Sequence, residues 1–305
     1  MRRILIGYDG SEHGDDALAL GRSLAEAAPS AEVIVATVYE QLSPKSRRDD
    51  ERPAQKRLRL AAEEIVARAR ERWPELDEVA LRTICANSPS RGLHRFAEEQ
   101  VVDAIVVGAS HRSPFGRVWP GSVTDRTLHG APCAVAVAPP GRARAKRSGL
   151  RRIGVGFDGS REASAALREA ARLADAAGAT LVLVWVIEVE TAFPVAFDFV
   201  GYVRDLHDFA HERLAAAAEH VPVGVPIERR EIEGRPAVEL GELDLDLDLL
   251  VVGSRGYGPL RRVLLGGVSS RVVRRAPCSV LVVPRPAASN PGDGQIAAAA
   301  AAEGG

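Results

Sequence analysis

The sequence predicts an α/β protein made of two tandem, doubly wound domains, and the first reason is an internal repeat. The segment ILIGYDGSE at 4–12 returns as IGVGFDGSRE at 153–162, and APCAVAVAP at 131–139 returns as APCSVLVVP at 276–284. The offset between the copies changes only from 149 to 145 residues. A unit of about 140 residues is too long for a solenoid repeat and has the size of a domain.

The second reason is that short apolar runs alternate with segments of helical periodicity. RILIGY, EVIVATVY, DAIVVGA and CAVAVAP are rich in Val and Ile and are apolar on both faces, as parallel strands between two helical layers are. A helix ending at Pro74 is predicted by apolar residues at i+3 and i+4 spacing: Leu58, Ala62, Ile65, Ala69 and Trp73. Strands that alternate with helices form a parallel sheet, with ligands beyond its carboxyl edge.

The boundaries follow from composition. We expect domain 1 at 1–140, a basic linker at 141–150, domain 2 at 151–285, and a disordered tail at 286–305. The linker is rich in Gly, Arg and Lys, which is typical of an exposed connection. The tail has few large apolar residues to offset the entropy of ordering.

Composition limits the function classes. The formal net charge is −1, so the chain has no basic surplus for nucleic acid. Three cysteines without a C-x-x-C pair predict neither a disulfide framework nor a cysteine metal site. The first apolar run, ILI at 4–6, ends at Gly7 and no run of 18 apolar residues follows, so we expect no signal peptide, no membrane span and a cytoplasmic location.

Each copy has an acidic turn directly after its first strand. The motif G-[YF]-D-G-S contains Asp9 and Ser11 in the first copy and Asp158 and Ser160 in the second. The serine is a good helix N-cap, and Asp-Gly-Ser is also ordinary turn chemistry. The repeat favours a role for the acid at the ligand edge.

A glycine pattern follows the fourth strand in both copies. In the second copy, Gly253-Ser-Arg-Gly256 is followed by nine residues and then by Gly266-Gly267-Val268. The first copy has Gly108-Ala-Ser-His111, nine residues, and Gly121-Ser122-Val123. Glycine N–H groups and a helix N-terminus suit phosphate, whereas a ligand-free glycine-rich connection is the alternative.

Four motifs occur in the same order twice: the Asp-Gly-Ser turn, G-x-x-G, G-[ST] nine residues later, and a closing A-P-C-x-V-x-V strand. Together they resemble the universal stress protein family in its tandem form and its ATP-binding branch. The resemblance covers about 270 of the 305 residues. It implies a five-stranded parallel sheet in each half and an adenine nucleotide at the strand ends. It also implies ATP, with or without Mg²⁺, a role in stress signalling, and at most weak ATP hydrolysis.

The resemblance also assigns site residues by position. Asp9 and Asp158 would meet the ribose or adenine, and Val38 and Val186 would contact adenine through their backbone. The ribose and phosphates would be held in the first half by Gly108, Gly121, Ser122 and Val123. In the second half they would be held by Gly253, Gly256, Gly266 and Val268.

Two positions depart from the family pattern. His111 replaces a glycine, which adds a Cβ in the predicted cradle, although a protonated imidazole would meet phosphate. Gly267 replaces a Ser or Thr, which removes a hydroxyl donor and keeps the N–H. Whether both halves, one half or neither binds ATP is therefore open, and the milder change favours the second half.

The resemblance further implies that the last strands, around 133–138 and 278–283, pair the two halves into a pseudo-dimer. Two chains could associate into a homodimer, and a signalling partner is unidentified. One alternative function is an interaction module with degenerate pockets.

The other alternative is an NAD-dependent oxidoreductase, suggested by the G-x-G-x-x-G formed by Gly154, Gly156 and Gly159. The first copy has Leu5 where the second has Gly154, so we expect Gly154 to lie inside a strand. The next acid at a strand end, Glu188, comes 29 residues after Gly159 instead of the usual 20 or so. Both observations weigh against the dinucleotide fingerprint.

Overall fold

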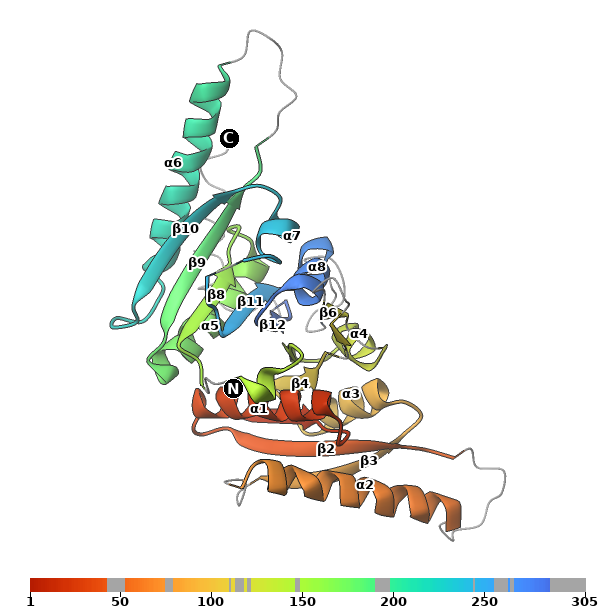
Figure 1. Ribbon diagram of the computed structural model, residues 1–305. Helices are drawn as coiled ribbons and strands as arrows, with labels where there is room; N and C mark the ends of the chain where they lie inside the picture. The colour runs from red at the N-terminus through yellow and green to blue at the C-terminus, as the bar shows by residue number, and fades with distance from the viewer. Residues whose placement is uncertain are drawn as a thin grey trace. The chain divides into compact units, whose positions relative to one another are not determined.

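The computed structural model describes residues 1–42, 53–74, 79–109, 111–112, 118–119, 122–145, 149–189, 198–243, 245–254, 263 and 266–285. The chain divides into two compact units, Met1–Gly149 and Leu150–Gly305. Each unit contains its own parallel sheet flanked by helices (Figure 1).

Unit 1 alternates strands and helices along the chain. Its elements are β1 Arg3–Gly7, α1 Glu12–Glu26, β2 Glu32–Glu40, α2 Pro53–Arg72, β3 Ala80–Ala86, α3 Pro89–Glu99, β4 Ala104–Gly108, β5 His111–Arg112, β6 Val118–Trp119, α4 Ser122–Leu128, β7 Ala134–Ala138 and the 3₁₀ turn η2 Arg142–Arg144. The main sheet has the order β3-β2-β1-β4-β7, with all neighbours parallel. The short strands β5 and β6 form a separate antiparallel pair.

Unit 2 repeats this order. Its elements are β8 Arg152–Gly156, α5 Arg161–Ala177, β9 Thr180–Ile187, α6 Phe199–Ala218, β10 Ile227–Glu233, α7 Pro236–Glu239, β11 Leu249–Gly253, α8 Gly267–Arg275 and β12 Ser279–Val283. Its sheet runs β10-β9-β8-β11-β12, again with parallel neighbours. The predicted α/β class and the five-stranded parallel sheet in each half are confirmed.

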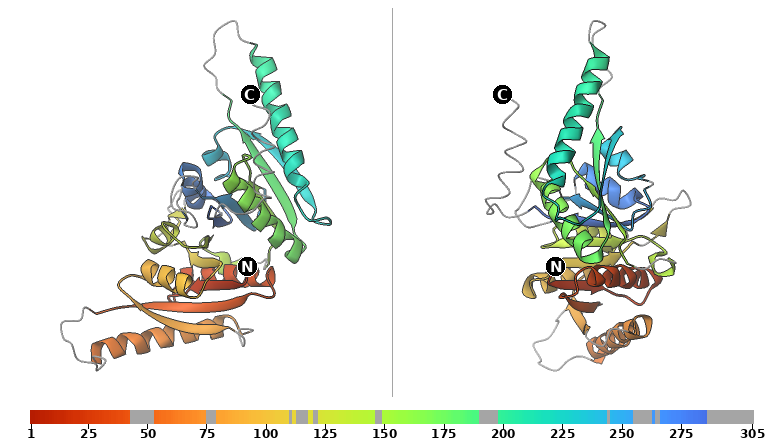
Figure 2. Two further views of the ribbon diagram at one scale, coloured as in Figure 1. Left: turned by 180° about the vertical axis from the view of Figure 1, so that it is seen from behind. Right: turned by 90° about the vertical axis from the view of Figure 1, so that its left-hand side faces the viewer.

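Helices cover both faces of each sheet. In unit 1, a Cβ at Gly21 of α1 would touch Ile6, whereas a Cβ at Gly7 would touch Leu93 of α3. Adjacent residues of a strand point to opposite faces, so α1 and α3 lie on opposite sides of β1. In unit 2, α6 lies along β9 and β10, as the view from behind in Figure 2 shows.

The central strands are buried on both faces, as their apolar runs predict. Ile4, Leu5 and Ile6 of β1 are each 0% exposed. The edge strand β10 reads IERREIE and has no buried residue, and charge on an edge discourages pairing with other chains. In the part of the chain that the structure describes, no helix is both long and apolar enough to cross a bilayer.

In unit 1, β2 and β3 are added on one side of β1, and the chain then crosses to the other side of β1 to add β4 and β7. The direction of strand addition therefore reverses beside β1. This is the topological switch point at which doubly wound sheets bind ligands, beyond the carboxyl ends of the strands. Gly154, by contrast, lies inside β8 as predicted, and a Cβ there would collide with Leu247.

Candidate functional site

The Asp-Gly-Ser turn has the same geometry in both units. Asp9 Oδ1 accepts hydrogen bonds from the backbone N–H of Ser11 at 3.0 Å and from its hydroxyl at 2.5 Å. Asp158 Oδ1 accepts from the Ser160 N–H at 3.0 Å. The glycines between them, Gly10 and Gly159, have φ of 76° and 77°, a conformation that side chains disfavour. The turn therefore requires glycine in both copies.

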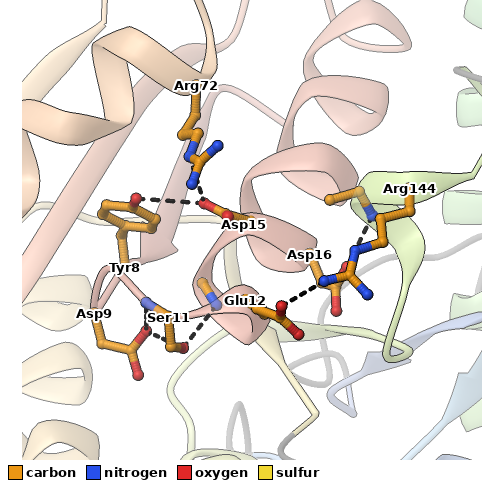
Figure 3. A network of polar contacts seen from close by, with 10 residues as sticks. Tyr8, Asp9, Ser11, Glu12, Asp15, Asp16, Arg72 and Arg144 are labelled. Atoms are coloured by element: carbon orange, nitrogen blue, oxygen red, sulfur yellow. Dashed lines mark hydrogen bonds and ion pairs between the residues drawn. The ribbon is translucent and has the colours of Figure 1, made fainter.

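The serine of each turn begins the next helix, as the sequence predicts. The Ser11 hydroxyl accepts from the Gly14 N–H at 3.2 Å, and the Ser160 hydroxyl accepts from the Ala163 N–H at 3.1 Å. The second carboxylate oxygen of Asp9 points away from the turn (Figure 3). Asp9 is exposed, so a ligand at the strand ends can reach this oxygen.

Behind the turn of unit 1, two polar contacts to Asp15 of α1 link the segment after β1 with α2. The Tyr8 hydroxyl donates to Asp15 Oδ1 at 3.4 Å, and Arg72 of α2 lies 3.5 Å from the same carboxylate (Figure 3). Burial and then the charge of Asp15 raise the pKa of Tyr8, while Arg72 lowers it. Unit 2 has Phe157 and Ser164 at the corresponding places, so these contacts are specific to unit 1.

A cavity of about 320 Å³ opens at the carboxyl edge of the unit 1 sheet. This volume is at the lower end of the range for small-molecule sites. The lining residues come from β1, β2, β4, α1, α3 and α4 and from the turn after β1. The sequence-predicted site residues among them are Asp9, Val38, Gly108, Ser122 and Val123.

The walls of this cavity differ in chemistry. Val38, Leu93 and Val107 form an apolar part, to which Pro89 and Ala36 contribute. Asp9, Ser122 and Thr124 bring polar atoms to the lining. An apolar slot with a few polar groups is the usual composition of a small-molecule site.

Gly108 has a structural role as well as a place in the lining. A Cβ at this position would overlap the backbone carbonyl of His13 in α1. Its own carbonyl oxygen accepts a hydrogen bond at 2.7 Å from the Thr124 hydroxyl, which fixes α4 to the end of β4. Gly108 thus allows α1 and α4 to approach the strand closely.

The second copy repeats part of this arrangement. A Cβ at Gly253 would lie 2.8 Å from the carbonyl carbon and oxygen of Glu162 in α5. Gly266 is the N-cap of α8, and its N–H donates to the Ser269 hydroxyl at 2.9 Å. Gly267 and Val268 are exposed in the first turn of α8.

Val186 of β9 corresponds to Val38 of β2, because Gly156 pairs with Val184 as Gly7 pairs with Ala36. Both valines are half-buried. Asp158 is exposed at the end of the strand, as Asp9 is. Gly121 and Gly256 lie outside the described residues. The backbone of His111 pairs with Trp119, and its side chain lies outside the described part.

Sequence reasoning missed several lining residues. Thr124 could have been found, because it follows Gly-Ser-Val where Ser269 follows Gly-Gly-Val in the other copy. Pro89 has a counterpart in Pro236, and both begin helices after the third strand of their unit. His13, Leu93 and Val107 carry no such signal, because their place in the lining depends on how helices and strands pack.

Two tandem, doubly wound α/β units with a cavity at the switch point define a class of proteins that place ligands at the carboxyl edge of a parallel sheet. The family model of the universal stress protein family matches residues 1–139 and 149–284. The chain belongs to the universal stress protein family, with two such domains in tandem.

Known proteins resemble this chain to different extents. A universal stress protein of Mycobacterium tuberculosis is 33% identical over 182 residues, which are 59% of this chain and 61% of that relative. The chain thus matches somewhat less than two thirds of the length of this curated relative. The crystal structure of a universal stress protein from Archaeoglobus fulgidus has 21% identity and a TM-score of 0.66, and the match covers 93% of this chain and 98% of that one.

A further universal stress protein, solved in complex with cAMP, has 23% identity and a TM-score of 0.35. That match covers 46% of this chain and 97% of the other.

Proposed function

We propose that this protein binds an adenine nucleotide, ATP with or without Mg²⁺, and acts in stress response or signalling with at most weak ATP hydrolysis. The observation that carries the proposal is the cavity at the switch point of unit 1. It gathers residues from distant parts of the sequence, Asp9, Val38 and Ser122 among them, at one sheet edge. A cytoplasmic location belongs to the same proposal.

The apolar part of the cavity suits a purine. Val38 of β2, Leu93 of α3 and Val107 of β4 are aliphatic and line the same cavity. Aliphatic walls bury the faces of a base, and strand backbone groups can read its edge. These residues would therefore hold adenine, with Val38 contributing through its backbone.

The polar residues suit the sugar and phosphates. Asp9 has a carboxylate oxygen outside the Asx turn (Figure 3), and a carboxylate accepts well from ribose hydroxyls. Ser122 and Val123 begin α4 and line the same cavity. The Ser122 hydroxyl and the N–H groups of this turn would meet the phosphates.

We place the stronger case in unit 1, although the sequence pattern favours unit 2. The reason is that five of the predicted site residues line one cavity in unit 1: Asp9, Val38, Gly108, Ser122 and Val123. In unit 2, Asp158, Val186, Gly253, Gly266, Gly267 and Val268 remain the proposed nucleotide residues. His111, Gly121 and Gly256 remain proposed contacts at their loops.

The alternatives differ from this proposal in what they bind. A dinucleotide enzyme would need the glycine fingerprint in a turn, but Gly154 lies in the middle of β8. An interaction module with degenerate pockets would bind no nucleotide. The association of the halves through 133–138 and 278–283, a homodimer and a signalling partner stay predictions.

Calorimetric titration with ATP and Mg²⁺ tests the proposal. We expect saturable heat with a dissociation constant between micromolar and sub-millimolar, and weaker binding of NAD. Preference for NAD would favour the oxidoreductase. The absence of heat and of a thermal shift up to millimolar ATP would leave the interaction module. Mass spectrometry of ligand released from freshly purified protein provides an independent check.

A further inference from the structure

A second cavity of unit 1 lies on another side of α1. Its volume is about 710 Å³, larger than that of the first cavity. It is lined by residues of α1, by Arg72 and Trp73 at the end of α2, and by residues 140–145. We call residues 140–145 the connecting strap. The nucleotide proposed above does not use this cavity.

A buried carboxylate fixes the connecting strap on α1. Asp16 is 3% exposed. Its Oδ2 accepts from the Gly141 N–H at 2.9 Å and its Oδ1 accepts from the Ala143 N–H at 2.8 Å. Arg142 of the strap donates to the Ser23 hydroxyl at 3.0 Å and to the Gly149 carbonyl at 3.2 Å. The strap is therefore an ordered wall of the cavity.

Arginines outnumber carboxylates in the lining of this cavity. Its lining contains four arginines, Arg22, Arg72, Arg142 and Arg144, and three carboxylates, Glu12, Asp15 and Asp16. Glu26, outside the lining, pairs with Arg22 at 3.1 Å, so the formal charges of the lining groups and this partner balance.

The carboxylates are occupied by other contacts. Asp16 is bonded to the strap backbone, Glu12 is paired with Arg144, and Asp15 receives the Tyr8 hydroxyl (Figure 3). When a ligand enters, the two hydrogen bonds to Asp16 would remain in place, whereas Arg144 would exchange Glu12 for the ligand.

Two of the arginines have donors to spare. Arg142 bonds two neutral oxygens, and no carboxylate among the described residues pairs with it. Arg72 lies 3.5 Å from Asp15, which is longer than a hydrogen bond, and its side chain is 64% exposed. A guanidinium presents five donors in a planar fork that fits phosphate oxygens.

We propose that this cavity is a binding site for a small phosphorylated anion, held by Arg72 of α2 and by Arg142 and Arg144 of the connecting strap. Arg22 of α1 also lines the cavity, where it is paired with Glu26. Because the strap supplies part of the site, the ligand holds the strap against α1 and α2. Occupancy thus acts on the segment through which the chain leaves unit 1.

Inorganic pyrophosphate, titrated by calorimetry at constant ionic strength into the full chain, tests this site. We expect saturable binding that weakens about tenfold or more in Arg72→Gln and in Arg142→Gln, the usual effect of losing a charge-assisted hydrogen bond. Arg95→Gln is the matched control, because Arg95 pairs with Glu99 on α3 and lies in neither cavity lining. We expect it to bind as the unaltered chain does.

Val123→Glu separates the two cavities. Val123 is 38% exposed in the lining of the first cavity, where a carboxylate repels phosphate. Pyrophosphate binding that persists in Val123→Glu and weakens in the Arg72 and Arg142 variants supports the second cavity. The proposal would be overturned if pyrophosphate binding were lost only in Val123→Glu, or if the Arg72, Arg142 and Arg95 substitutions weakened it equally. It would also be overturned if no saturable binding were seen. Failure of ATP to bind would leave this test unaffected.

Discussion

The backbone carbonyl of His13 occupies the space that a Cβ at Gly108 would need. The first residues of α1 and the end of β4 can therefore approach each other only because position 108 is glycine. The same relation joins Glu162 and Gly253 in unit 2. The glycine after the fourth strand thus has a packing role in both copies, independent of any ligand.

Gly108→Ala is expected to destabilise unit 1 by about 1–3 kcal/mol, because the added methyl group meets backbone that cannot move as a side chain would. Urea denaturation measures the change. Gly267→Ala is the matched control, because Gly267 lies in the first turn of α8 and a Cβ added there would have no atom within 4 Å. We expect its effect to be neutral or stabilising by up to about 1 kcal/mol. Equal stability of the Gly108→Ala chain would contradict this packing role.

Asp16→Ala is expected to release the connecting strap. The substitution removes the acceptor of two N–H groups, at a cost of about 1–3 kcal/mol. Hydrogen exchange should accelerate at Gly141 and Ala143. Glu99→Ala, which removes a long and exposed ion pair on α3, should leave these amides unchanged. Unchanged exchange in Asp16→Ala would show that Asp16 does not hold the strap.

Stability should depend on pH through His207. Its ring lies 2.9 Å from Glu233 and 3.3 Å from Glu231, and these hydrogen bonds raise the pKa of His207, that to Glu233 most. Because the pKa of His207 is higher in the folded state than in the unfolded state, these contacts stabilise the fold fully below the unfolded-state pKa of about 6.5. This stabilisation is lost as the pH rises through the folded-state pKa.

His207→Gln should therefore destabilise the chain below about pH 6.5 and have little effect at high pH. The site is at the surface, so we expect less than about 1 kcal/mol. Urea unfolding across this pH range measures it. His220→Gln, where the ring contacts the Ala216 carbonyl, serves as the control. If His207→Gln destabilised the chain more at high pH than at low pH, the predicted stabilisation by protonated His207 and its two glutamates would be contradicted.

Cys133 should be chemically silent in the native chain. Burial, with the negative charge of Asp103, raises the pKa of its thiol to about 12, and only the thiolate is nucleophilic. A thiol reagent at mildly alkaline pH should label the same number of thiols per folded chain in the unaltered protein and in Cys133→Ser. If the substitution lowers the native stoichiometry by one thiol, the accessibility assigned to Cys133 is wrong.

Much of this architecture could be predicted, because the repeat reports domain size and the apolar runs report strands directly. The Asp-Gly-Ser turns were predictable for the same reason, since local chemistry determines them. Asp9 and Ser11 are two residues apart, and their contact needs no knowledge of packing.

The connecting strap was not predictable in this way. Asp16 and Gly141 are 125 residues apart, and a buried aspartate looks like any other helical aspartate in sequence. The sequence predicts an exposed linker; Gly141, Ala143 and Arg144 are exposed, whereas Arg142 is half-buried and Leu150 is buried. Its hydrogen bonds to α1 depend on tertiary packing. The same is true of Leu93 and Val107 in the first cavity.

The most direct measurement of the central proposal is calorimetric titration of ATP and Mg²⁺ into four chains: unaltered, Val123→Glu, Val268→Glu and Val223→Glu. Val123 and Val268 occupy the same position in the two units and are 38% and 39% exposed, while Val223 is fully exposed in a loop. A nucleotide in the unit 1 cavity predicts that Val123→Glu weakens binding about tenfold or more, by like-charge repulsion at the phosphates. Val223→Glu should bind as the unaltered chain does. If Val268→Glu abolishes binding while Val123→Glu leaves it intact, the nucleotide is in unit 2 and the unit 1 assignment is contradicted.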